Sequence, residues 1–597
     1  MKKSIILGAV IASFVLSSCS LFKTYSTESK DLDLYLLDSA TVGGKKIEEC
    51  KLGSINTTFI NGEGYIPYFS LEQYASLYQP YFEDDVKSEV TTEGTTSTWT
   101  IYRGEELYFV AMVSSFLKTI MTAGSISSVL ATDTNPSDYS VIKKFTNFTD
   151  SIEHLTEQNY AEYKFSSYSF KVITKNSKKY YPLGLLDNAF SEASGLYHFY
   201  NYKNLYVTWD VENFSKNFKT STGETSVDKE MESVTVGQTI PQYLLDYNAS
   251  CFLFTLDNFY GLKSYYKIDS MKNYFSRYTF YSDLYSTNGE KRGIAYSSAL
   301  ALFDDHHTGL VSANNAWGEG KTAAIGGESV IKRQYQNKEL SRIRKETFMT
   351  SNQYTVSTDH KTVLYYFDSF DLGTKDDVFN PDGTVRVTAY EHDSYYNLLQ
   401  HLQQFEKDSR IENVIIDVST NGGGIIAVMA KMLALISKDN KGIVSLMDEN
   451  TGVVDTSTCQ VDVNMDGQYT ADEVYGNKFN FYVMTSNCSF SCGNAFPYYA
   501  QKMGIKTIGE KSGGGECAVG IHYMPNSEYV YHSSMTHIGY YDAAKKEFTG
   551  FESGAKPDIS LVNSGKSGYT YYDDFGNVRY SIPDGLYNVN KLSTLLN

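Results

Sequence analysis

The chain has 597 residues, too many for one hydrophobic core, so we expect about two to four domains. Hydrophobic residues make up 42% and charged residues 20%, which is typical of folded globular domains and not of long disorder. The formal net charge of −18 argues against nucleic acid as a partner and against electrostatic binding to anionic lipid.

The first 18 residues have the pattern of a targeting segment. Lys2 and Lys3 precede an apolar run over 5–16 that is too short for a typical spanning helix. Residues 16–19 (Leu-Ser-Ser-Cys) resemble a bacterial lipobox, in which cleavage before Cys19 would let its thiol carry the lipid. We therefore expect an extracytoplasmic protein held at a bacterial membrane by its lipid alone. An ordinary signal peptide that contains a cysteine is the alternative.

The rest of the chain divides by pattern. Residues 64–102 and 179–208 both predict strand, short helix, strand, so a duplicated module is expected, while apolar spacing is helical from about 240 to 303. The predicted units are a signal peptide (1–18), a tether (19–30), a Tyr-rich α+β module (31–135), a second such module (136–235), a helical lobe (236–350) and a core (351–597).

The core alternates short apolar strands with helices. Strands are predicted at 363–367, 414–418 and 479–485, and helices at 394–405, 424–436 and 492–502. Such alternation predicts an α/β domain with a largely parallel sheet covered by helices.

Three segments carry side chains suited to chemistry: 304–308 (Asp-Asp-His-His-Thr), 417–424 (Asp-Val-Ser-Thr-Asn-Gly-Gly-Gly) and 489–494 (Ser-Phe-Ser-Cys-Gly-Asn). A glycine run after a strand lets backbone N–H groups approach a ligand. A serine at a strand-to-helix turn sits at the positive end of the helix, and a histidine is a base near neutral pH. Taken singly, the same segments also fit a tight turn, a helix N-cap and a solvated or metal-binding histidine pair.

In order, residues 305–308, 417–424, 491–494, 508–514 and 554–559 resemble five motifs of the C-terminal-processing (tail-specific) serine peptidases and their tricorn-core-like branch. The resemblance implies a crotonase/Clp-like β-α core and a serine-type peptidase that acts on proteins or peptides without a catalytic cofactor. It also implies roles: Ser491 as nucleophile, His307 as base, Glu552 as the acidic partner, and N–H groups of Cys492 and of Gly423 or Gly424 as the oxyanion hole.

Departures from the family pattern leave alternatives open. Ser489 is a rival nucleophile, and residues 513–516 (Gly-Gly-Gly-Glu) fill the place of the family's catalytic lysine, for which Lys511 is a poor substitute. We therefore expect His307, not a lysine, to be the base, with activity rising around its reference pKa of about 6.5. A catalytically silent relative that binds peptide or apolar ligands, and an adhesin that works through the Tyr-rich modules, are the other hypotheses.

Residues 462–473 fit the calcium-loop pattern D-x-[DN]-x-[DN]-G-x5-E completely. The predicted ligands of one structural Ca²⁺ are Asp462, Asn464, Asp466, Gln468, Thr470 and Glu473. A polar surface loop is the alternative. The six cysteines after Cys19 contain no C-x-x-C, which argues against a zinc site, and an oxidising compartment would allow a Cys492–Cys517 disulfide.

Overall fold

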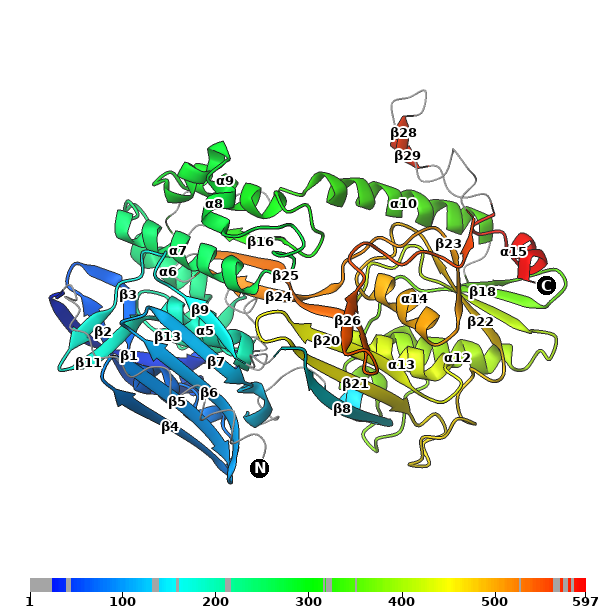
Figure 1. Cartoon of the computed structure of the whole chain (residues 1–597), viewed down its shortest axis with the longest axis horizontal. Helices are drawn as coiled ribbons and strands as arrows, with labels where there is room; N and C mark the ends of the chain where they lie inside the picture. Colours follow the sequence, from blue (N-terminus) through cyan, green and yellow to red (C-terminus); the bar gives the residue numbers. More distant parts are fainter. Residues whose placement is uncertain are drawn as a thin grey trace.

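The computed structural model describes residues 24–38, 44–130, 139–156, 160–209, 216–314, 317, 325–348, 352–524, 528–561, 570–572, 578–580 and 585–596. The predicted signal segment and Cys19 lie outside the described residues. The molecule has a β-rich N-terminal half and a C-terminal α/β half, with one long helix running along the top of the latter (Figure 1). No helix in the described part is long and apolar enough to cross a membrane.

The C-terminal half is built on a six-stranded sheet with the order β17-β18-β19-β22-β23-β27. Every neighbouring pair is parallel except β17 and β18. The strands are β17 Tyr354–Val356, β18 Thr362–Tyr366, β19 Asn413–Asp417, β22 Asn480–Thr485, β23 Lys506–Gly509 and β27 Ile559–Ser560. The predicted α/β core with a largely parallel sheet is confirmed.

Helices cover both faces of this sheet. The predicted helices are present as α12 Ser394–Phe405, α13 Ile426–Ile436 and α14 Cys492–Lys502. Because successive strand residues point to opposite faces, Val414 and Ile416 pack in the cluster that contains these three helices, whereas Ile415 packs with Leu340 of α10 (Glu328–Phe348). The short helices α11 Lys375–Val378 and α15 Val589–Leu596 complete this half, with the β28 (Thr570–Tyr572) and β29 (Val578–Tyr580) hairpin.

The N-terminal half differs from the two separate modules predicted. Its larger sheet has the order β10-β11-β3-β2-β1-β13-β12, so strands from 31–135 and from 136–235 share one sheet, and its second sheet has the order β4-β5-β6-β7-β9. The strands are β1 Thr27–Leu36, β2 Lys51–Ile60, β3 Glu63–Phe69, β4 Val86–Glu93, β5 Thr96–Arg103, β6 Glu106–Ser114, β7 Thr119–Gly124, β9 Ala161–Lys164, β10 Ile173–Lys175, β11 Lys178–Pro182, β12 Tyr197–Tyr200 and β13 Leu205–Thr208. The helices are α3 Leu71–Ser76, α4 Tyr139–Lys143, α5 Leu183–Ser194 and α6 Val227–Thr235, and β14 Phe218–Thr220 pairs with β15 Gly223–Thr225.

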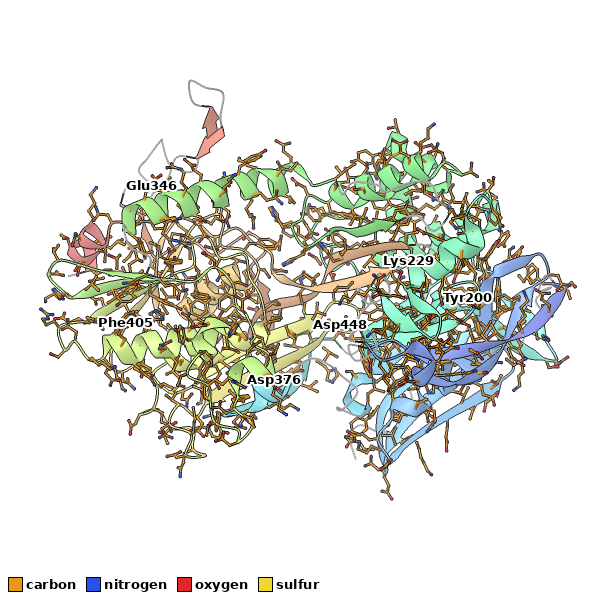
Figure 2. All side chains as sticks on the ribbon, turned by 180° about the vertical axis from the view of Figure 1, so that it is seen from behind. Tyr200, Lys229, Glu346, Asp376, Phe405 and Asp448 are labelled. Carbon is orange, nitrogen blue, oxygen red and sulfur yellow. The ribbon has the colours of Figure 1, made fainter. Side chains whose placement is uncertain are left out.

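A third sheet joins the two halves, with the order β16-β25-β20-β21-β8 and with β24 and β26 also paired to β25. Its strands are β8 Thr146–His154, β16 Gly309–Asn314, β20 Gly442–Asp448, β21 Val453–Val461, β24 Cys517–Tyr523, β25 Glu528–Asp542 and β26 Glu547–Gly550. Helices α7 Gln242–Phe259, α8 Met271–Phe275 and α9 Gly289–Ala301 lie above it (Figure 1). From behind, Asp448 lies between Tyr200 and Lys229 on one side and Phe405 on the other (Figure 2).

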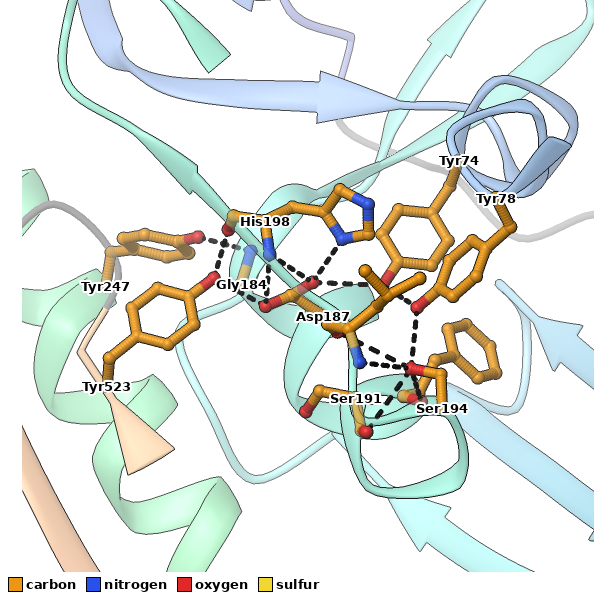
Figure 3. Close-up of polar contacts among 11 residues, drawn as sticks. Tyr74, Tyr78, Gly184, Asp187, Ser191, Ser194, His198, Tyr247 and Tyr523 are labelled. Carbon is orange, nitrogen blue, oxygen red and sulfur yellow. Dashed lines mark hydrogen bonds and ion pairs between the residues drawn. The ribbon is translucent and has the colours of Figure 1, made fainter. Parts of the chain in front are cut away.

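A buried polar network fixes β24 to the N-terminal half (Figure 3). Asp187 of α5 is fully buried and accepts hydrogen bonds from Tyr74 Oη at 3.1 Å and from His198 Nδ1 at 2.8 Å. Tyr523, the last residue of β24, donates to the same carboxylate. A buried carboxylate is costly unless it is hydrogen-bonded, so moving Tyr523 away would leave Asp187 with one partner fewer. The network therefore fixes the position of the end of β24. The other end of β24 begins at Cys517, next to the predicted site.

Candidate active site

The nucleophile candidate Ser491 lies in a strained turn between β22 and α14. Its backbone has φ 55° and ψ −126°, although it is not a glycine. Such a conformation costs of order 1–3 kcal/mol and is concentrated at functional sites. The turn is fixed because Ser491 N–H donates to Gly514 O at 3.1 Å while Ser491 C=O accepts from the N–H groups of Asn494 and Ala495, both at 2.8 Å. The turn places Ser491 at the N-cap, the positive end of α14.

The rival nucleophile Ser489 has a structural place. Its side chain is fully buried, donates to Val418 O at 2.7 Å and accepts from Ser486 N–H at 3.1 Å. Ser491 is partly exposed, and its hydroxyl makes no hydrogen bond to any described residue. The geometry therefore favours Ser491.

The glycine run after β19 lies directly against this turn. Gly423 has φ +113°, and a Cβ added there would stand 2.6 Å from Ser491 Cβ and 2.9 Å from its Oγ. Gly423 N–H donates to Asn421 Oδ1 at 2.8 Å, so it is engaged. The N–H groups of Gly424 and Cys492 have no acceptor among the described residues, which makes them the pair best suited to bind an oxyanion.

The histidine loop between α9 and β16 is organised by Asp305. This buried carboxylate accepts from His307 N–H at 2.7 Å, Thr308 Oγ1 at 2.5 Å, Tyr260 Oη at 2.9 Å and Ser534 Oγ at 3.1 Å. The aspartate of the motif thus shapes the loop and does not contact the imidazole ring of His307 through a hydrogen bond.

The ring of His307 is buried against Phe490, with centroids 4.6 Å apart, and its Nδ1 has no hydrogen-bond partner among the described residues. Burial, together with the charges of His532 and Arg333 and against that of Asp305, lowers the pKa of His307 to about 4. The imidazole is therefore neutral, as a base must be, already at a pH well below its reference pKa of about 6.5. The expected rise of activity around pH 6.5 does not follow for a His307 with this lowered pKa.

The acidic partner Glu552 lies beside the same turn. Its Oε2 accepts from the N–H groups of Gly515 at 3.1 Å and Glu516 at 2.8 Å. Burial raises the pKa of Glu552 to about 7 against these backbone hydrogen bonds, and the negative charges of Glu516 and Asp305 add to the rise. Glu552 therefore becomes fully ionised only above neutral pH.

The turn at 513–515 contacts Ser491, Glu552 and the Phe490 ring that packs on His307. Gly514 accepts from Ser491, and a Cβ on it would stand 3.8 Å from Glu552 Oε1, while a Cβ on Gly515 would stand 2.3 Å from the Phe490 ring that covers His307. No hydrogen bond joins Ser491, His307 and Glu552 to one another within the described chain.

Sequence reasoning missed two arginines of α10. Arg333 Nη2 donates to Gly513 O at 2.6 Å, and its guanidinium carbon lies 4.2 Å from the centroid of Phe490. Arg344 Nη2 pairs with Asp368 at 2.8 Å, and its Nη1 lies 3.7 Å from buried Asp417. Neither stands in a motif, so only the packing of α10 over the site reveals them.

The predicted calcium loop follows β21. Asp462 is buried and accepts from the N–H groups of Asp466 at 3.1 Å and Gly467 at 2.9 Å, and Gly467 has φ +84°. Glu473 accepts from the N–H groups of Val463 at 3.1 Å and Thr470 at 3.0 Å. The carboxylates at the first and last ligand positions thus both point into the loop and accept hydrogen bonds from its backbone. Carboxylate oxygens held in this way are the type of ligand that a hard cation such as Ca²⁺ prefers.

The cysteines do not form the predicted pair. Cys492 and Cys517 are both buried and form no disulfide with each other. Cys492 Sγ donates to Gly424 O at 3.2 Å, and Cys517 Sγ lies 3.9 Å from His537 Nδ1. The disulfide expectation is wrong in this structure because each thiol packs against a different partner.

Comparison with known proteins supports the peptidase class. Residues 382–561 match the family model described as Peptidase family S41, a range that holds the glycine run, Ser491 and Glu552 but not His307. No curated protein matches the sequence significantly.

Solved structures similar to this chain include a lipoprotein from Streptococcus agalactiae (12% identity, 54% of this chain and 92% of that chain, TM-score 0.33). A photosystem II D1 C-terminal processing protease (11% identity, 35% and 48%, TM-score 0.25) and the tricorn protease (11% identity, 83% and 43%, TM-score 0.28) also match.

Proposed function

We propose that this chain is a serine peptidase that cleaves exported proteins or peptides through Ser491. The observation that carries the proposal is the strained backbone of Ser491 at the N-cap of α14, pressed against Gly423 and beside the free N–H groups of Gly424 and Cys492. The match of residues 382–561 to Peptidase family S41 supports the same class.

In the proposed reaction, Ser491 Oγ bonds to the scissile carbonyl carbon and neutral His307 takes its proton. The N–H groups of Gly424 and Cys492 bind the oxyanion. When the intermediate collapses, the C–N bond breaks, His307 gives the proton to the leaving amine, and water then hydrolyses the acyl-enzyme. Ionised Glu552 stabilises the protonated imidazole. For these steps His307 must swing from Phe490 toward Ser491 when substrate enters.

Hydrolysis of a quenched peptide library by the purified chain tests the proposal. The wild-type protein should cleave members of the library, and Ser491→Ala should not. Ser489→Ala is the matched control on the same turn and, if it folds, should keep activity. Equal cleavage by Ser491→Ala and the wild type would refute the assignment.

A silent, ligand-binding relative is the second candidate. It is favoured by one observation: the His307 ring packs on Phe490 at 4.6 Å and makes no hydrogen bond to Ser491. If this candidate is right, the chain binds peptides in the library by fluorescence anisotropy without cleaving them, and Ser491→Ala binds equally well.

We also propose that Cys19 carries a lipid and holds the protein outside the cytoplasm. The support is the short apolar run before the Leu-Ser-Ser-Cys sequence. Cys19→Ala should move the protein from the membrane fraction to the soluble fraction. A variant that stays with membranes would show that another feature anchors the chain.

We further propose that the 462–473 loop binds one structural Ca²⁺. The complete ligand pattern and the inward hydrogen bonds of Asp462 and Glu473 support this. The loop leads from β21 toward β22, the strand that ends at the Ser491 turn, so an ordered loop would stiffen the approach to the site.

A further inference from the structure

A buried ion pair lies next to Glu552. One of its members, Glu516, lies in the segment 513–516, where the family pattern has a catalytic lysine. Glu516 and His537 are both buried, and His537 Nδ1 lies 2.6 Å from Glu516 Oε1. Glu516 directly precedes β24 and His537 lies on β25, so the pair joins two strands of the bridging sheet.

Glu516 and Glu552 hold each other through their backbones. Glu516 Oε2 accepts from Glu552 N–H at 2.7 Å, and Glu552 Oε2 accepts from Glu516 N–H at 2.8 Å. A Cβ on Gly550 would stand 2.1 Å from Glu516 Oε2, so the chain leaves room for this carboxylate only because residue 550 has no side chain. The position of Glu552 therefore depends on the position of Glu516.

The same group of side chains includes Cys517, and the possible ligand atoms of Glu516, Cys517 and His537 all lie within 4.8 Å of one another. A metal is nevertheless a poor explanation. The 2.6 Å between Nδ1 and Oε1 is the length of a charge-assisted hydrogen bond with a proton between the atoms. Burial raises the pKa of the Cys517 thiol to about 12, which keeps it protonated.

The charges around His537 favour its protonated form. Burial alone would lower its pKa, but the side chains of Cys517, Glu449 and Glu516 around the ring raise the pKa of His537 to about 12. Glu449 approaches the other ring nitrogen, Nε2, at 3.7 Å from the end of β20. His537 is thus a cation enclosed by carboxylates.

The charged and titratable groups that face Glu552 come from several elements. Besides Glu516, they are Asp305 of the histidine loop, Tyr266 of the helical lobe, Arg333 of α10 and Cys517 of β24. The carboxylates of Glu516 and Asp305 oppose ionisation of Glu552. His537 neutralises one of them, Glu516, directly.

We propose that Glu516 and His537 are a positioning pair, which fixes Glu552 through its backbone and cancels the charge that would otherwise oppose ionisation of Glu552. This inference rests on the proposed peptidase function. The pair takes over the place of the missing lysine but acts through Glu552 and does not touch substrate.

The proposal has a definite effect on pH dependence. Glu552 supports catalysis when ionised, so activity rises as pH passes upward through its pKa. Glu516→Gln removes a negative charge, while Glu449 at 3.7 Å from Nε2 still holds the His537 cation, so the acid limb of the pH profile should move down by about one pH unit or more. In Glu516→Gln/His537→Gln the cation is gone as well, so the limb should return toward that of the wild type.

The experiment measures the rate of Ser491 labelling by a fluorophosphonate probe against pH. The expected order of acid limbs is Glu516→Gln lowest, with the double variant and wild type close together. His522→Gln, which removes another buried histidine of the same strand pair, is the control and should not move the limb. Unchanged limbs in Glu516→Gln, or an equal shift in both variants, would overturn the proposal.

A second measurement on the wild-type protein does not depend on how the variants fold. Deuterium exchange at the imidazole C2 position, followed by mass spectrometry, reports the protonation of each histidine. His537 should remain protonated from about pH 6 to about pH 9, and titration near its ordinary value would overturn the pair. If no labelling occurs in any protein at any pH, the peptidase proposal fails, whereas the exchange result still decides the pair.

Discussion

Replacing Gly423 by alanine should abolish most of the activity without unfolding the chain. A Cβ at this position would stand 2.6 Å from Ser491 Cβ and 3.2 Å from Cys492 N. Carbon atoms in contact lie about 3.5–4.0 Å apart, so the glycine run and the serine turn must separate by about 1 Å. A misplacement of about 1 Å costs on the order of a hundredfold in rate, or about 2.7 kcal/mol of barrier.

The Gly423→Ala variant should lose some folding stability but remain folded. The φ of +113° at Gly423 is a strained region for alanine, which costs of order 1–3 kcal/mol. Gly422→Ala is the matched control, because a Cβ at the neighbouring position meets nothing within 4 Å. The assays are peptide hydrolysis and thermal melting of both variants. Wild-type turnover by Gly423→Ala would refute the close approach of the two turns on which the site depends.

Three further predictions concern other parts of the molecule. Excess Ca²⁺ added after chelation should raise the melting temperature, because a hundredfold excess over Kd adds about 2.7 kcal/mol to the free energy of unfolding. Glu473→Gln should remove this gain. No gain in the wild type would contradict the calcium loop. His307→Ala should lower turnover by about a hundredfold or more, while Lys511→Ala, at an exposed side chain, should change little; the reverse result would point to a lysine base. Asp187→Asn should destabilise the chain by about 1–3 kcal/mol, more than Tyr523→Phe, because the amide NH₂ that it introduces would face the hydrogen-bond donors around this carboxylate in Figure 3; equal melting of Asp187→Asn and wild type would contradict the account of the network.

The strands and helices of the parallel core were predictable because each one shows its own hydrophobic spacing within a short stretch of sequence. The apolar run that forms β19 and the helix over 394–405 follow from hydrophobic spacing alone, and their bounds agree with the structure to within a residue. The Tyr-rich half was harder. Its two stretches repeat the same order of strand and helix, but β1 pairs in parallel with β13 across more than a hundred residues, and such long-range pairing leaves no local signal.

The candidate site was predictable only where a motif carried it. The segments around Ser491 and Gly423 were identified by their resemblance to family motifs, because glycine and serine at a strand end also fit an ordinary turn and a helix N-cap. The role of Glu516 did not follow, because its partner His537 lies on another strand and in no motif. The shift of the His307 pKa to about 4 could not be read from sequence either, since it depends on burial beneath Phe490.

Peptide mapping of the protein after reaction with a fluorophosphonate tests the central claim most directly. The account predicts one adduct, on Ser491, with none in Ser491→Ala and with slower formation in Gly423→Ala. An adduct on another serine, or an intact and folded wild-type protein that forms none, would contradict the assignment of Ser491 as the nucleophile.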